Sequence, residues 1–193
     1  TALKSSSTDH IAVCLEGGEE IVADHVVSAL QANTLAHLVH ESDNSLAVAA
    51  SAIPMNGLVV ANYIFRGRLL DVDGFGYLVP TTEPEGGVLG VVFDSCAFPQ
   101  QDDVSYLTSE IGTITRLTVM TGGPKMRDVY GGFGIDESAV HSVSLNALHN
   151  HLGITSDPIH AAVMPWADCM PQYTVGHSER VRNIENAARA GWE

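Results

Sequence analysis

Residues 74–80 read Gly-Phe-Gly-Tyr-Leu-Val-Pro, and residues 87–95 read Gly-Val-Leu-Gly-Val-Val-Phe-Asp-Ser. Between these two largely apolar runs, residues 81–86 are Thr, Thr, Glu, Pro, Glu and Gly, a composition typical of a turn. The pattern therefore predicts a β-hairpin. The second run is apolar at almost every position, which favours a strand that is covered on both faces.

Glycines interrupt this hairpin at Gly74, Gly76 and Gly90. A glycine within a strand marks a β-bulge or the close approach of a ligand or another backbone. The pattern by itself favours a core hairpin in which the glycines form bulges.

Length and composition restrict the class of protein. A chain of 193 residues with a hydrophobic fraction of 45% is long enough and apolar enough to bury a core. Nine basic against 23 acidic residues give a formal net charge of −14, which argues against nucleic acid as a partner and against electrostatic attachment to anionic lipid. The three cysteines are widely spaced, which suits reduced thiols better than a disulfide framework.

The common catalytic and metal-binding motifs are not found. His141 and His149 fall on one helical face, but His151 points elsewhere and no Cys-x-x-Cys pair occurs, so we predict no metal site. A Gly-x-Ser-x-Gly nucleophile elbow and a Gly-x-x-x-x-Gly-Lys phosphate loop are also absent. The residues alone therefore assign no catalytic role.

The hydrophobic pattern predicts several further elements. We expect strands in four segments, which are residues 11–15, 20–27, 58–65 and 111–120. Asn33 is predicted to cap one helix, and a second helix is expected to end near Pro54. A third should run from a cap at Asp136 to Leu152, ending at Gly153, with a buried face made of Val140, Val143, Ala147 and Leu148. Residues 178–190 predict a solvated helix.

Four ordered blocks of sequence resemble one known family. They are the hairpin with Phe-Pro-Gln-Gln at 98–101, Ala-Asp-His-Val-Val-Ser-Ala-Leu at 23–30, Leu-Thr-Val-Met-Thr-Gly-Gly at 117–123, and Cys-Met-Pro-Gln-Tyr-Thr-Val-Gly-His at 169–177. In order and spacing these blocks are similar to the protoporphyrinogen oxidases, which belong to the flavin amine-oxidase superfamily. The resemblance extends from about residue 22 to residue 177.

The resemblance implies a mixed α/β (α+β) fold in which segments of an FAD-binding domain flank an antiparallel substrate-binding sheet with helices. Residues 1–45 would be part of the FAD-binding domain, residues 46–170 the substrate-binding region, and residues 171–193 a return toward the FAD-binding domain.

The resemblance also implies an activity. Members of the protoporphyrinogen oxidase family use FAD to oxidise protoporphyrinogen IX to protoporphyrin IX in haem biosynthesis, with molecular oxygen as the acceptor. Gly76, Leu78 and Val92 would line the tetrapyrrole pocket with Phe75 beside them, and Met120 would pack against a pyrrole ring. Ser28 and Ala29 would lie near the flavin, and Tyr173 and His177 would form part of the active-site wall.

Several family features are missing from the sequence. The Gly-x-Gly-x-x-Gly turn that binds the FAD pyrophosphate is absent, so we expect this chain to be a middle-to-late segment that is inactive and retains no FAD by itself. The family's location is the mitochondrial inner membrane, with membrane association through segments not found here, and the resemblance allows a homodimer. Two alternatives stay open: another flavin amine-oxidase relative, of the carotenoid desaturase or monoamine oxidase type, and a non-catalytic tetrapyrrole-binding module.

Overall fold

The computed structural model describes residues 2–5, 10–82, 87–102, 112–125, 130–131 and 134–192. The chain forms two compact units. Unit 1 combines residues 1–55 with residues 171–193, and unit 2 is the continuous segment 56–170. Unit 2 is therefore inserted into the sequence of unit 1.

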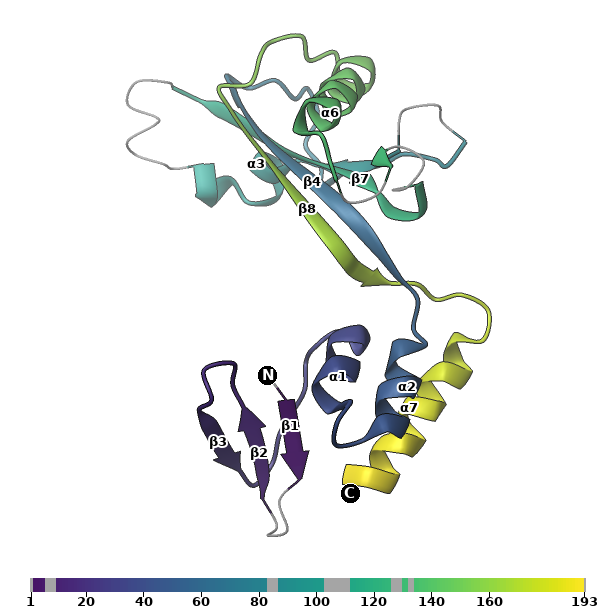
Figure 1. The fold of residues 1–193 in the computed structure, drawn as a ribbon. Helices are drawn as coiled ribbons and strands as arrows, with labels where there is room; N and C mark the ends of the chain where they lie inside the picture. The colour runs from purple at the N-terminus through teal and green to yellow at the C-terminus, as the bar shows by residue number, and fades with distance from the viewer. Residues whose placement is uncertain are drawn as a thin grey trace. The chain divides into compact units, whose positions relative to one another are not determined.

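Unit 1 contains a small antiparallel sheet and three helices (Figure 1). Its elements are β1 (Ala2–Ser5), β2 (Ile11–Cys14), β3 (Glu20–Ala23), α1 (Ala32–Val39), α2 (Asn44–Ser51) and α7 (His177–Trp192). The three strands pair in the order β1-β2-β3. The predicted pairing of residues 11–15 with the following strand is confirmed, but that strand ends at Ala23 instead of continuing through Val27.

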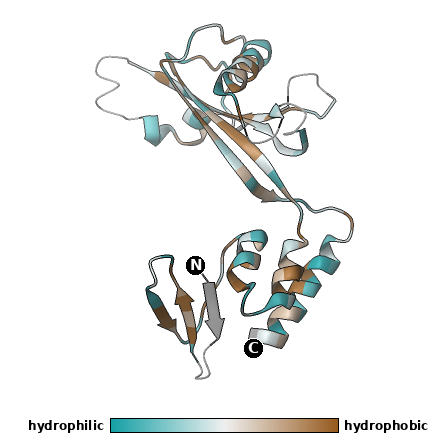
Figure 2. Cartoon of the chain, in the orientation of Figure 1, coloured by the Kyte–Doolittle hydropathy of each residue, from teal (hydrophilic) through white to brown (hydrophobic). Residues whose placement is uncertain are grey.

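A hydrophobic cluster holds the helices of unit 1 together. Its buried members lie on α1 and α2, and are Ala36, Val39, Leu46, Ala47 and Ala50. Ile184, Ala187 and Ala188 of α7 pack against this cluster, so one stripe of the predicted solvated helix is not exposed to solvent. Brown segments on α2 mark part of the cluster in Figure 2.

The helices α1 and α2 differ at their N-termini, because a side chain caps α2 but not α1. The prediction that Asn33 caps α1 is wrong, because the helix begins at Ala32 and Asn33 Oδ1 accepts from the neighbouring amide of Thr34. Asp43 caps α2, where its Oδ1 accepts from the backbone N–H groups of Ser45 and Leu46 at 3.0 Å each.

Unit 2 is built on a five-stranded sheet with the order β5-β6-β7-β4-β8. The strands are β4 (Met55–Arg66), β5 (Gly76–Leu78), β6 (Val88–Val92), β7 (Ile114–Gly122) and β8 (His160–Pro171). The pairs β5/β6, β6/β7 and β4/β7 are antiparallel. The amides of Ile159 and Gln172 donate to the carbonyls of Ile64 and Pro54, so β8 runs antiparallel to β4 as well.

The predicted hairpin is confirmed by the pairing of β5 with β6, although residues 83–86 of its turn lie outside the described residues. The strand predicted at residues 58–65 is also confirmed and is longer at both ends. The strand predicted from residue 111 begins instead at Ile114, and residue 111 lies outside the described part of the chain. Short helical turns complete the unit, namely α3 (Asp94–Ala97), η1 (Pro99–Asp102) and η2 (Gly123–Lys125).

Helix α6 (Glu137–Leu152) covers one face of this sheet (Figure 1). Its predicted ends are confirmed: the side chain of Asp136 accepts from the Ser138 amide, and Gly153 closes the helix at φ 67°. Its predicted buried face is confirmed too, with Val140, Ala147 and Leu148 buried and Val143 partly buried. Opposite these side chains lie Val59, Ala61, Tyr63 and Phe65 of β4 and Leu117 and Val119 of β7.

The architecture confirms a mixed α/β fold with an antiparallel sheet and helices. The finer assignment of domains stays a prediction. Within the described ranges, every helix is too short or too polar to cross a lipid bilayer.

Candidate functional site

The face of the unit 2 sheet opposite α6 carries two side-by-side rows of residues. Across four strands, one row consists of Val60, Met120, Gly90 and Leu78, and the next consists of Asn62, Thr118, Val92 and Gly76. Neighbouring strands lie ~4.8 Å apart and side chains alternate between faces. Each row therefore presents its side chains on the same surface, and each has a glycine where β5 and β6 meet.

An apolar pocket of about 340 Å³ lies over these rows. Its lining consists of Phe75, Gly76, Tyr77, Leu78, Leu89, Gly90, Val91, Val92 and Met120. The structure thus brings together all five residues that the sequence singled out for substrate binding. Tyr77, Leu89 and Val91 were not among the predicted site residues, although each lies beside a glycine of the same hairpin.

The pocket walls are open to solvent to different degrees. Phe75 is 70% exposed and Leu78 is 87% exposed, whereas Leu89, Val92 and Met120 are half-buried. The prediction of a strand covered on both faces is therefore wrong for β6, since only its other face, with Val91 and Phe93, is packed in the core. Large apolar side chains exposed around a concavity are typical of a surface that binds a ligand or a partner.

Backbone packing explains two of the hairpin glycines. A Cβ atom at Gly76 would lie 2.1 Å from the carbonyl oxygen of Val91, and one at Gly90 would lie 2.5 Å from that of Tyr77. Gly76 also has φ 147°, which L-residues rarely adopt. The register of β6 against β7 shifts between Val88 and Gly90, which is consistent with the predicted bulge at Gly90. These glycines thus bring the two strands together and leave a floor without side chains.

A polar network borders the apolar pocket along the second row. Thr118 Oγ1 lies 2.7 Å from Asp94 Oδ2 and 2.8 Å from Asn62 Oδ1. Further along β7, the guanidinium of Arg116 pairs with the carboxylate of Asp102 and donates to the carbonyl oxygen of Phe98 at 3.0 Å. Arg116 is therefore engaged within the protein, so it is poorly placed to anchor a carboxylate of a ligand.

The ionisable groups suit binding better than proton transfer. Tyr77 is the one ionisable residue among the described residues of the pocket lining, and its side chain packs toward the α6 core. Burial raises the pKa of Tyr63 and of Tyr130 above 10.0, and both hydroxyls contact residues of the α6 side, His141 and Thr121 respectively. Both hydroxyls are thus protonated at neutral pH. In the part of the chain that the structure describes, no group of three or more His, Cys, Asp or Glu side chains could hold a metal ion.

The remaining predicted site residues belong to unit 1. Tyr173 is 78% exposed and stacks on the imidazole of His177 with ring centroids 4.2 Å apart. Among the described residues, Nδ1 of His177 is buried without a hydrogen-bond partner. Ser28 lines a cavity of about 290 Å³ together with His25, and its neighbour Ala29 is exposed. The roles predicted for these four residues stay predictions.

Comparison with known proteins identifies relatives of this chain. The family model described as flavin containing amine oxidoreductase matches residues 1–189. The chain is 38% identical over 162 residues to the protein named protoporphyrinogen oxidase from Homo sapiens, an alignment that covers 83% of the chain and 32% of that protein. The chain thus spans about a third of the length of this relative.

Solved structures share the fold at low sequence identity. A putative protoporphyrinogen oxidase from Exiguobacterium sp. 255-15 matches the whole chain and 39% of its own, with a TM-score of 0.70 and 17% identity. Reduced UDP-galactopyranose mutase matches with a TM-score of 0.69 and 11% identity over 93% of this chain and 36% of its own. At such identities the likeness concerns the fold alone, and the family model supplies the assignment. The chain belongs to the flavin containing amine oxidoreductase family.

Proposed function

We propose that this chain provides the substrate-binding sheet of an FAD-dependent protoporphyrinogen oxidase, which converts protoporphyrinogen IX to protoporphyrin IX with molecular oxygen as acceptor. The observation that carries the proposal is the convergence of Phe75, Gly76, Leu78, Val92 and Met120 on one apolar pocket. The name of the human relative supports the same substrate. The mitochondrial inner membrane is the location we propose with it.

The pocket has the chemistry that a tetrapyrrole requires. A porphyrinogen is a broad, mostly apolar macrocycle, and the glycine floor at Gly76 and Gly90 leaves room for close contact with its rings. Leu78, Val92 and Met120 would exclude water from the macrocycle and fix its orientation by apolar contact. The polar side chains Thr118 and Asp94 at the pocket border offer oxygen acceptors for pyrrole N–H groups.

FAD would have to be held largely by other residues. The sequence contains no Gly-x-Gly-x-x-Gly turn for the pyrophosphate, and the residues that fit a flavin contact are the exposed pair Ser28 and Ala29 ahead of α1. When bound, the flavin would accept hydride equivalents from the porphyrinogen and pass the electrons to oxygen, giving hydrogen peroxide. We assign residues 1–45 and 171–193 to the FAD-binding domain and residues 46–170 to the substrate-binding region, a division that the two compact units support in outline.

A chimaera tests the proposal. The segment of the human relative that aligns with this chain is replaced by the chain itself, and oxidation of protoporphyrinogen IX is followed by porphyrin fluorescence. We expect turnover above the non-enzymatic background, and its loss with Leu78→Asp, because a charge in the apolar pocket disfavours the macrocycle. The flavin absorbance of each chimaera controls for folding.

Two outcomes favour the alternatives. A chimaera that holds FAD but oxidises an amine or a carotenoid instead would identify another amine-oxidase relative. Tight binding of protoporphyrin IX by the 193-residue chain, combined with an inactive FAD-loaded chimaera, would identify a binding module without catalysis.

A further inference from the structure

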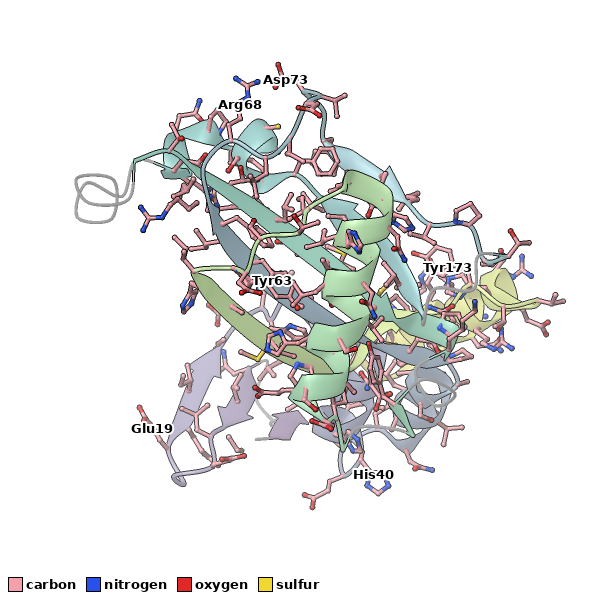
Figure 3. All side chains as sticks on the ribbon, turned by 90° about the horizontal axis from the view of Figure 1, so that it is seen from above. Glu19, His40, Tyr63, Arg68, Asp73 and Tyr173 are labelled. Atoms are coloured by element: carbon pink, nitrogen blue, oxygen red, sulfur yellow. The ribbon has the colours of Figure 1, made fainter. Side chains whose placement is uncertain are left out.

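Two tyrosine–histidine pairs join α6 to two different strands of the unit 2 sheet. The hydroxyl of Tyr63 on β4 lies 2.9 Å from Nδ1 of His141, and the hydroxyl of Tyr77 on β5 lies 2.8 Å from Nδ1 of His151. Both pairs also make edge-to-face ring contacts, with centroids 5.7 Å and 5.2 Å apart. Figure 3 shows Tyr63 beside α6. The same chemistry thus occurs at an interior strand and at an edge strand.

The two strands differ in how firmly the sheet holds them. β4 lies between β7 and β8, whereas β5 has three residues and, among the described strands, pairs with β6 alone. The backbone bonds that flank β5 run from the Val79 amide to Leu89 and from the Phe93 amide to Phe75, each at 2.9 Å. A short edge strand opens locally more easily than an interior one. Its contact with α6 is therefore a second restraint that β4 does not need.

Tyr77 lies between two residues of the pocket wall. Because side chains alternate along a strand, Tyr77 packs toward the α6 core while Gly76 and Leu78 face the pocket. The Tyr77 ring also contacts Phe93 of the core edge-to-face, with centroids 6.0 Å apart. A movement of Tyr77 would consequently move both neighbouring residues of the pocket.

We propose that the Tyr77–His151 pair is a positioning device for the apolar pocket. It fixes β5 against the end of α6 and thereby sets the position of Leu78 opposite Met120. Neither side chain contacts the ligand with its polar group, so both act through the neighbouring residues of β5. The identity of the ligand rests on the proposed function, whereas the restraint on β5 does not.

The first measurement is amide hydrogen exchange on the full 193-residue chain. Tyr77→Phe keeps the ring contacts and removes only the hydroxyl, so we expect the Val79 and Phe93 amides to exchange about tenfold faster, as loss of one hydrogen bond predicts. Tyr63→Phe is the matched control and should leave the exchange rates of the Val79 and Phe93 amides unchanged. The Ile159 amide, which donates to the carbonyl of Ile64 on β4, serves as the reference amide for these rates.

The second measurement is protoporphyrin IX binding by fluorescence. Tyr77→Phe and His151→Leu should raise Kd several-fold, Tyr63→Phe should not, and His151→Asn should restore much of the affinity because it keeps a polar atom at the δ position. This rescue would not occur if His151 served only to fill space.

Each outcome decides a separate point. Unchanged exchange of the Val79 and Phe93 amides in Tyr77→Phe overturns the positioning role. Faster exchange with an unchanged Kd also overturns it, since β5 would then be restrained without affecting the pocket. If the parent chain binds no protoporphyrin IX, the chimaera still decides the proposed function, and the exchange data alone decide whether the pair restrains β5.

Discussion

Gly76 lines the apolar pocket and is also required for the close pairing of β5 with β6. Because its Cβ position falls against the backbone of β6 and its φ is 147°, Gly76→Ala should destabilise unit 2 by about 1–3 kcal/mol through strain alone. Gly74→Ala is the matched control, since nothing lies within 4 Å of a Cβ atom there. Urea unfolding measures both free energies. Equal stabilities for the two variants would contradict this account of Gly76.

Met120 and Leu117 lie on the same strand, and comparing them distinguishes a pocket residue from a core residue. Met120 is half-buried on the open face of β7, whereas Leu117 is 1% exposed on the face under α6. Leu117→Ala should therefore cost about 2–5 kcal/mol of unfolding free energy, and Met120→Ala only about 1 kcal/mol.

The two substitutions should affect ligand affinity in the opposite order to their effect on stability. On the proposed function, Met120→Ala raises the Kd for protoporphyrin IX about tenfold, while folded Leu117→Ala binds normally. A thermal melt and a fluorescence titration of each variant check the pair. A large loss of stability in Met120→Ala with unaltered binding would assign Met120 to the core.

The sequence singled out the glycines of the pocket, but it did not predict which contacts require a glycine there. The glycines within the apolar runs indicated that a ligand or another backbone segment approaches Gly76 and Gly90 closely. Whether that was a ligand or a backbone depended on the register of β5 against β6, which is set by pairing across the hairpin. Arg116 shows the same limit, because its partner Asp102 and the carbonyl of Phe98 come from a segment for which the sequence predicted neither a helix nor a strand.

At the scale of elements, the cap of α6 predicts a response to acid. Hydrogen bonds from the side chain and the amide of Ser138 hold the pKa of Asp136 below its ordinary value of 3.8. The folded state therefore favours the ionised form, and the cap stabilises the protein above the unfolded-state pKa. That stabilisation is lost as the pH falls through the lower pKa of the folded state.

Asp136→Asn isolates this contribution, because asparagine caps helices without titrating. We expect the stability of the parent chain to fall more steeply than that of the variant below about pH 4. Unfolding curves collected between neutral and acid pH test the difference. Parallel pH profiles for the two chains would show that the cap does not titrate in this range.

Local signals explain why α6 was predicted accurately and other elements were not. Asp136 and Gly153 mark the ends of α6 with residues that act within one turn of the chain. The ends of β3 and the start of α1 lack such signals, since α1 begins after Gln31, whose side chain makes no cap. The extent of β8 depends on its pairing with β4, about a hundred residues earlier in the sequence, so an apolar run alone could not reveal it.

At the scale of the whole molecule, only the family resemblance suggested that unit 1 is discontinuous, and the hydrophobic pattern by itself gave no sign of it. Helix α7 has few large apolar side chains, and its stripe of Ile184, Ala187 and Ala188 is narrow. Packing against the cluster on α1 and α2 partly buries that stripe, and in the sequence those helices precede unit 2 whereas α7 follows it. The composition of α7 therefore suggested a solvated helix.

This arrangement predicts that the two units respond separately to a change in α7. Ile184→Asp puts a charge against the apolar cluster of unit 1, so unit 1 should open far more readily. Amide exchange should accelerate at Asp43, whose N–H bonds to Val39, and remain unchanged at Val79 in unit 2. Asn186→Asp adds the same charge at an exposed position of α7 and should alter neither amide. Equal acceleration at both amides in Ile184→Asp would instead mean that the units unfold as one cooperative body, because opening of either would then require opening of the other.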